Sequence, residues 1–131
     1  MKTFIAAALL VLGPAIAHAA DVEGTWATET NEDGNYLEVT VHPCPSDGAK
    51  MCGTIDRAMG PSGPQPGYEH EGRQMISDME PNGANRYANG KIWAPDTDKT
   101  YSSNMQLNGN VLTVKGCVLF ICRGQDWSRV N

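Results

Sequence analysis

The chain has 131 residues, the length of one small domain, and carries 10 basic and 15 acidic side chains. A formal charge of −5 with scattered lysines and arginines argues against a nucleic-acid-binding protein, because phosphate recognition needs a concentrated basic surface. Fourteen glycines and eight prolines predict many turns and few long helices.

The first residues have the features of an export signal. Lys2 precedes an apolar stretch over residues 4–16 that is too short to span a bilayer, and Ala17-His18-Ala19 matches a cleavage site. We therefore expect a signal peptide over residues 1–19 and a single β-barrel domain over residues 20–131. The mature protein should be periplasmic or secreted and should contain no transmembrane segment, because no later stretch is long and apolar enough.

All four cysteines follow the signal, and an even number in an exported chain predicts two disulfides. Three pairings are possible, of which local pairing of Cys44 with Cys52 and of Cys117 with Cys122 is favoured. Neither spacing is the C-x-x-C arrangement typical of zinc ligands, so we expect no metal site at the cysteines. We also expect no cofactor.

Short segments with strand character follow one another along the chain. The clearest one alternates Leu37, Val39 and Val41 with polar residues, as expected when one face of a sheet is buried. Asp33-Gly34 and Asn108-Gly109 are strong turn signals between such segments. About eight strands are expected, which predicts an all-β sandwich or barrel: residues 24–30, 36–42, 51–56, 74–79, 87–93, 100–107, 111–114 and a last run that reaches Arg129.

Residues 57–72 interrupt this pattern with three prolines and four glycines. Such a composition predicts a loop, because proline removes a backbone donor from a strand ladder. A loop of this length serves as a lid, as a binding segment or as a mobile connection, and the composition does not choose among these roles.

Tryptophan and arginine residues mark the two ends of the domain. Gly24-Thr25-Trp26 opens the first strand, and Trp127-Ser128-Arg129 closes the last one. These two motifs are similar to the ends of lipocalin-like barrels. In such barrels the guanidinium of the last strand lies over the indole of the first and gains cation–π attraction. We therefore expect Trp26 and Arg129 to determine the fold rather than to form a site.

Further motifs in chain order extend this resemblance, namely Pro43-Cys44, Cys52-Gly53, residues 90–95, Lys99-Thr100-Tyr101 and Gly116-Cys117. Together with the two ends, they resemble domain of unknown function family 2147, which comprises small secreted bacterial proteins. The resemblance implies a single antiparallel β-barrel of about eight strands with a lipocalin-like build. It brings no catalytic residues.

An enzyme would need a base or nucleophile with a partner. His42 and His70 are the two histidines after the signal, neither has an evident companion in the sequence, and we expect both on the surface. No G-x-S-x-G or H-E-x-x-H motif occurs. The sequence therefore favours a non-enzymatic protein.

An eight-stranded barrel has an interior that is filled by side chains or holds one small ligand. The inward set is expected to comprise Leu37, Val39, Val41, Ile55, Met75, Tyr101, Met105 and Val114. Methionines beside aromatic rings suit an adaptable apolar pocket. We therefore predict a small apolar or amphipathic ligand, contacted by Val39, Met75, Tyr101 and Met105.

The alternative is a structural or protein-interaction module with a filled core and an unidentified partner. Its contact surface would be the apolar run Val118-Leu119-Phe120-Ile121, which lies between Cys117 and Cys122. The same run is also expected to pack as a plug across one end of the barrel.

Overall fold

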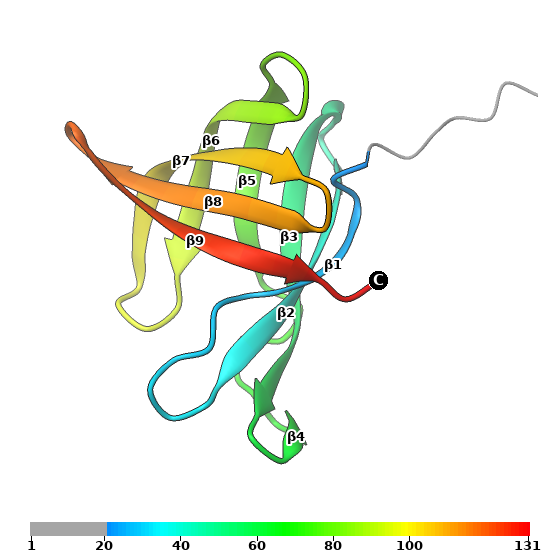
Figure 1. Ribbon diagram of the computed structural model, residues 1–131, viewed down its shortest axis with the longest axis vertical. Coiled ribbons are helices and arrows are strands. Elements are labelled where there is room, and N and C mark those ends of the chain that lie inside the picture. The colour runs from blue at the N-terminus through cyan, green and yellow to red at the C-terminus, as the bar shows by residue number, and fades with distance from the viewer. Residues whose placement is uncertain (1–20) are drawn as a thin grey trace, which may run out of the picture.

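A computed structural model describes residues 21–131, so the expected signal peptide lies outside the described residues (Figure 1). Strands account for most of the described chain, and they are joined by short turns. Within these residues, no helix has the length and apolar character that a membrane span requires. The strands are β1 (Gly24–Ala27), β2 (Tyr36–Cys44), β3 (Asp47–Gly60), β4 (Gly63–Gln65), β5 (Gln74–Pro81), β6 (Arg86–Ala94), β7 (Lys99–Asn108), β8 (Val111–Val118) and β9 (Ile121–Arg129).

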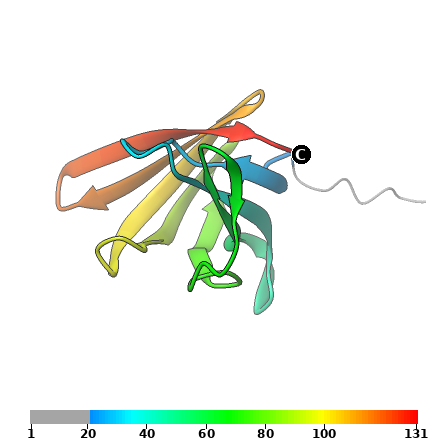
Figure 2. The same ribbon diagram turned by 90° about the horizontal axis from the view of Figure 1, so that it is seen from below.

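Eight of these strands close into an antiparallel barrel, which confirms the predicted fold. The hydrogen-bonded order is β2-β1-β9-β8-β7-β6-β5-β3, and pairing of β3 with β2 completes the ring. β4 stays outside the ring and pairs with the end of β3 alone. Figure 2 shows the strands wrapped around a common axis, and Figure 1 shows β4 in a small hairpin with the end of β3 at one end of the molecule. Closure removes unpaired edges from the sheet.

Trp26 and Arg129 are Cα partners where the first strand meets the last. The guanidinium carbon of Arg129 lies 4.3 Å from the centroid of the Trp26 ring. Nη1 of Arg129 donates to the carbonyl oxygen of Glu23 at 3.1 Å, and Nη2 donates to that of Asp21. The predicted cation–π pair therefore marks the seam of the barrel and also holds the segment that precedes β1.

The core fills the end of the barrel near this seam. The side chains of Trp26 and Trp127 are fully buried, and Nε1 of Trp26 donates to the carbonyl oxygen of Val22 at 2.9 Å. Val22 thereby covers this end from the N-terminal side. Other residues buried in this core are Val39, Val41, Ile55, Ile76, Met79, Met105, Leu107 and Leu112.

Both predicted disulfides are present, between Cys44 and Cys52 and between Cys117 and Cys122. The first joins the end of β2 to β3, and the second lies between β8 and β9 near their turn. In a chain-entropy model, each short ring contributes about 2 to 2.5 kcal/mol to the free energy of unfolding.

The segment expected to be a loop over residues 57–72 is shorter than predicted. β3 continues to Gly60, and Pro64 lies in the short edge strand β4, where a missing N–H is tolerated. The remaining segment, residues 66–73, is anchored to β3 because the N–H of Gly72 donates to the carbonyl oxygen of Ile55 at 2.7 Å. The N–H of Ile55 in turn donates to the carbonyl oxygen of Arg73 at 2.9 Å.

Candidate ligand-binding cavity

A cavity of about 770 Å³ opens at the end of the barrel away from the Trp26–Arg129 seam. β7 and β8 each run from the packed core to the cavity, as the residues at their inward positions show. Leu107 of β7 and Leu112 of β8 are buried at the closed end, whereas Tyr101 and Gly116 of the same strands line the cavity. The barrel is therefore filled at one end and open at the other.

The inner part of the cavity is apolar. Its lining side chains come from six different strands and meet because each occupies an inward position of its strand. Trp127 separates the cavity from the core below it, since its side chain is fully buried and still contributes to the lining. The apolar lining residues are Leu37, Ala58, Met75, Ile92, Val114 and Trp127.

Polar and charged side chains gather at the entrance. Oε1 of Glu29 accepts a hydrogen bond from the backbone N–H of Asp126 at 2.9 Å, which ties the β1–β2 connection to β9. The lining also includes carboxylates and one guanidinium from other turns and strands, namely Glu69, Asp96 and Arg123. A molecule in this cavity would therefore meet apolar surface at the bottom and polar groups at the mouth.

An aromatic cluster holds residues 66–73 beside the mouth. The rings of Tyr68 and His70 are 5.4 Å apart in an edge-to-face arrangement, and His70 meets Trp93 of β6 in the same way at 5.0 Å. The guanidinium carbon of Arg73 lies 3.4 Å from the centroid of the Trp93 ring. Nε1 of Trp93 donates to Oδ1 of Asp98 at 2.8 Å, so the cluster also fixes the β6–β7 turn.

Tyr68 has a perturbed environment within this cluster. Partial burial raises the pKa of its hydroxyl above the ordinary value, and the nearby carboxylates of Glu69 and Asp96 raise it further. The phenol therefore stays neutral at physiological pH and can both donate and accept a hydrogen bond at the mouth.

The four residues predicted to contact a ligand fall into two groups. Met75 and Tyr101 line the cavity, whereas Val39 and Met105 lie in the packed core and are not part of the lining. The reason is that two indole side chains, Trp26 and Trp127, occupy the end of the barrel where Val39 and Met105 point. Period-two alternation identifies an inward position but not its depth along the barrel axis.

The two histidines are less exposed than predicted. His70 was expected on the surface, but its side chain is 22% exposed, lines the cavity and packs between two aromatic rings. His42 is also partly buried, and its Nε2 lies 2.7 Å from Oγ1 of Thr54. Sequence spacing could not show that His70 would meet Trp93, because that contact depends on how residues 66–73 return to the barrel.

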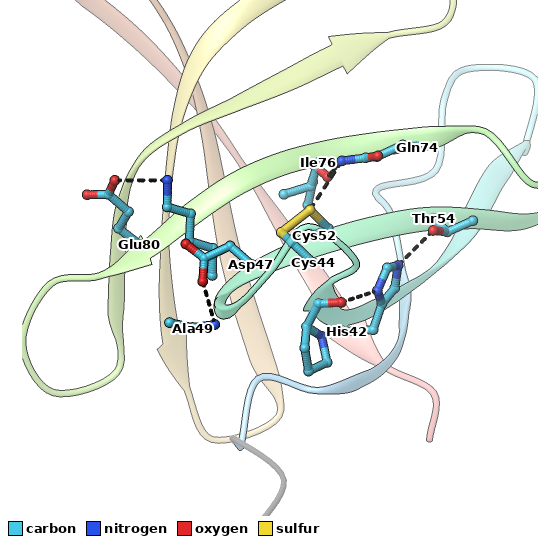
Figure 3. Close-up of a disulfide and its surroundings, with 11 residues drawn as sticks. His42, Cys44, Asp47, Ala49, Cys52, Thr54, Gln74, Ile76 and Glu80 are labelled. Carbon is cyan, nitrogen blue, oxygen red and sulfur yellow. Dashed lines mark hydrogen bonds and ion pairs between the residues drawn. A yellow bond between two sulfur atoms is a disulfide. The ribbon is translucent and has the colours of Figure 1, made fainter.

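One group of potential metal-ligating side chains is found among the described residues, comprising Cys44, Cys52 and Asp78. The two sulfur atoms are bonded to each other, so they cannot act as thiolate ligands in the oxidised protein. Figure 3 shows this disulfide beside Gln74, whose Nε2 donates to Sγ of Cys52 at 3.1 Å. The surroundings of this bond are those of a structural disulfide.

Comparison with known proteins agrees with this architecture. Protein HP1028 from Helicobacter pylori, described as a member of the lipocalin family, matches the structure with a TM-score of 0.67 at 16% sequence identity. The match covers 86% of this chain and 85% of that protein, and at this identity it shows a shared fold. A search of curated proteins found no match. The model of one bacterial family matches residues 24–129, and the chain therefore belongs to the family described as "Uncharacterized protein conserved in bacteria (DUF2147)".

Proposed function

We propose that this protein is exported, is not an enzyme, and binds one small apolar or amphipathic molecule in the open end of its barrel. The observation that carries the proposal is the cavity of about 770 Å³ with an apolar floor and a polar entrance. Ligand sites of proteins typically measure about 300–1,000 Å³ and combine a mostly apolar lining with a few polar groups. The cavity is therefore large enough for a molecule with an alkyl chain or a ring system.

The distribution of polarity supports an amphipathic ligand. Met75, Ile92 and Val114 offer apolar contacts inside, and methionine adapts to different shapes. Glu69, Asp96 and Arg123 at the mouth offer hydrogen bonds and charge to a polar end group. The lipocalin-like fold, shared with HP1028, also supports a binding role for the barrel interior.

Two further observations support export and the absence of catalysis. Two disulfides are typical of proteins in an oxidising compartment. Within the cavity, the hydroxyl of Thr28 accepts a hydrogen bond from the backbone N–H of Leu37 at 2.9 Å, and His70 packs between aromatic rings. Neither side chain is arranged as a nucleophile with its base.

Gly116 allows a direct test. A Cβ at this position would lie 3.5 Å from Cγ2 of Ile92 and 3.6 Å from Cβ of Tyr101, which is ordinary contact distance inside the cavity. Gly116→Leu should therefore fill the cavity without disrupting the barrel. Gly48→Leu is the matched control, because a Cβ at Gly48 has open space around it.

The measurement is a fluorescence titration of purified, delipidated protein with dansylaminoundecanoic acid. We expect saturable binding by the wild type and by Gly48→Leu, and at least tenfold weaker binding by Gly116→Leu at an unchanged melting temperature. If the probe does not bind the wild type and native mass spectrometry shows no co-purified molecule, the proposed binding function is wrong.

A further inference from the structure

The turn between β8 and β9 exposes four consecutive apolar side chains. Val118, Leu119, Phe120 and Ile121 are 54%, 92%, 101% and 69% exposed. We call these four residues the apolar tip. The prediction that this run packs as a plug across the barrel is therefore wrong. The apolar tip instead extends beyond the barrel wall, as Figure 1 shows at the end of the β8–β9 hairpin.

The apolar tip is concentrated and rigid rather than a scatter of surface residues. Among residues 21–131, the other large apolar side chains that are exposed are Val111 and Val130, which are 39% and 51% exposed. The disulfide between Cys117 and Cys122 locks the two strands directly behind the tip. The tip is thus a fixed apolar projection.

Backbone conformation indicates that apolar residues are placed here against local preference. Leu119 has a φ of +53°, in the left-handed region that bulky residues rarely adopt. The neighbouring β7–β8 turn meets a similar requirement with Gly109 at a φ of +62°. The turn therefore holds a bulky, exposed apolar side chain at a position where glycine would be less strained.

The charge around the tip is opposite to that of the whole chain. Lys115 and Arg123 flank it on β8 and β9, and residues 115–124 contain no acidic residue, although the chain carries 15 acidic against 10 basic side chains. Both side chains are exposed, and neither forms an ion pair with a residue in the described range. Apolar side chains with basic neighbours suit an anionic lipid surface.

The tip also lies next to the mouth of the cavity. Gly116 and Arg123 line the cavity and directly precede and follow the disulfide-bonded turn in the sequence. A surface that receives the tip would therefore lie close to the cavity entrance.

The size of the tip favours a bilayer over a protein partner. A stable protein interface buries about 800 Å² on each partner, which four side chains on a narrow projection cannot supply. A bilayer needs no complementary shape.

We infer that the apolar tip inserts into the interface of an anionic lipid bilayer, with Lys115 and Arg123 at the level of the headgroups. This inference does not depend on a ligand in the cavity, because the contacts that carry it lie outside the cavity. When the tip is inserted, the cavity mouth would face the membrane, so the proposed ligand would be bound next to the bilayer.

Flotation of the mature protein with vesicles tests the inference. The vesicles contain phosphatidylcholine and phosphatidylglycerol in equal amounts. We expect the wild type to float with them and the double variant Leu119→Ser, Phe120→Ser to partition at least tenfold less. The matched control is Val130→Ser, which removes an exposed apolar side chain at the opposite end of β9 from the tip and should bind as the wild type does.

Two further variants separate insertion from other modes of association. Lys115→Gln with Arg123→Gln should weaken binding to these vesicles but not to vesicles of phosphatidylcholine alone. In Phe120→Trp, the new indole should shift its emission to shorter wavelength on vesicle addition, while the native Trp26, Trp93 and Trp127 are already buried.

Defined outcomes would overturn the inference. One is that the wild type does not float, and another is that the Leu119→Ser, Phe120→Ser variant floats equally well. Light scattering showing a dimer that this variant dissociates would assign the tip to a second copy instead. The cavity variant Gly116→Leu should still float, and its loss of flotation would assign vesicle binding to the cavity rather than the tip.

Discussion

Arg129 combines three contacts that act at different points of the closed end. Its guanidinium lies over the ring of Trp26 and donates to the carbonyl oxygens of Asp21 and Glu23. A single side chain therefore joins the last strand, the first strand and the segment that precedes it. Lysine cannot reproduce this arrangement, because its ammonium lacks the planar set of donors.

Arg129→Ala should lower the free energy of unfolding by about 1–3 kcal/mol, because it removes a cation–π contact and two charge-assisted hydrogen bonds. Arg129→Lys should recover only part of this loss. Urea denaturation followed by tryptophan fluorescence measures both. Arg123→Ala is the control, since that side chain is exposed and should change stability by no more than about 0.5 kcal/mol. Equal stability of Arg129→Ala and the wild type would show that the seam does not depend on this residue.

Among the strands, β6 contains a glycine that the packing of β5 requires. A Cβ on Gly90 would lie 2.5 Å from Sδ of Met79 and 2.7 Å from the carbonyl oxygen of Ser77. The methionine could move, but the backbone oxygen belongs to the adjacent strand. The glycine therefore allows β5 and β6 to approach each other closely.

Gly90→Ala should consequently destabilise the protein by about 1–3 kcal/mol through overcrowding. Gly48→Ala is the matched control, because a Cβ at that position meets nothing within 4 Å. Thermal unfolding followed by circular dichroism compares the two variants. A melting temperature of Gly90→Ala equal to that of Gly48→Ala would mean that the strands adjust without cost.

Element by element, the sequence predicted strands better than it predicted what lies between them. Alternation over residues 36–42 identified the inward face of β2, because a strand side chain alternates between core and solvent. Proline and glycine content suggested a loop for all of residues 57–72, yet β3 continues to Gly60 and β4 follows. Edge strands tolerate these residues, and composition does not reveal which strands lie at an edge.

For the whole barrel, sequence patterns could predict closure but not the position of the cavity. The motifs at Trp26 and Arg129 indicated that the first and last strands meet, and they do. Whether an inward residue lines the cavity depends on strand register and on the volume of two indole rings at the closed end. These are properties of the assembled ring, so Met75 and Met105 could not be distinguished from the sequence.

The number of paired residues differs from one strand pair of the barrel to the next. β8 and β9 pair continuously from Val111 and Ser128 to Val118 and Ile121, whereas the paired residues of β1 and β9 are Trp26 with Arg129 and Ala27 with Ser128. Three backbone bonds between Thr25 and the residues after β9 extend the seam. The N–H of Thr25 donates to the carbonyl oxygen of Asn131 at 2.8 Å, and the carbonyl oxygen of Thr25 accepts from the N–H of Val130 at 2.8 Å and from that of Asn131 at 3.2 Å. The seam therefore depends on two paired positions and on a few backbone bonds that Thr25 makes with residues 130 and 131.

We expect the barrel to open first at this seam while the rest of the ring stays folded. In hydrogen exchange followed by NMR, the amides of Thr25 and Val130 should exchange at least tenfold faster than protected amides of β7 and β8, corresponding to an opening free energy lower by about 1.4 kcal/mol or more. Arg129→Ala should accelerate the seam amides more than the others. Equal protection at the seam and in β7 and β8 would contradict this, because the ring would then open only by global unfolding. A seam that opens locally would leave the Cys117–Cys122 hairpin and the cavity lining of β7 and β8 in place, since their pairing does not involve β1.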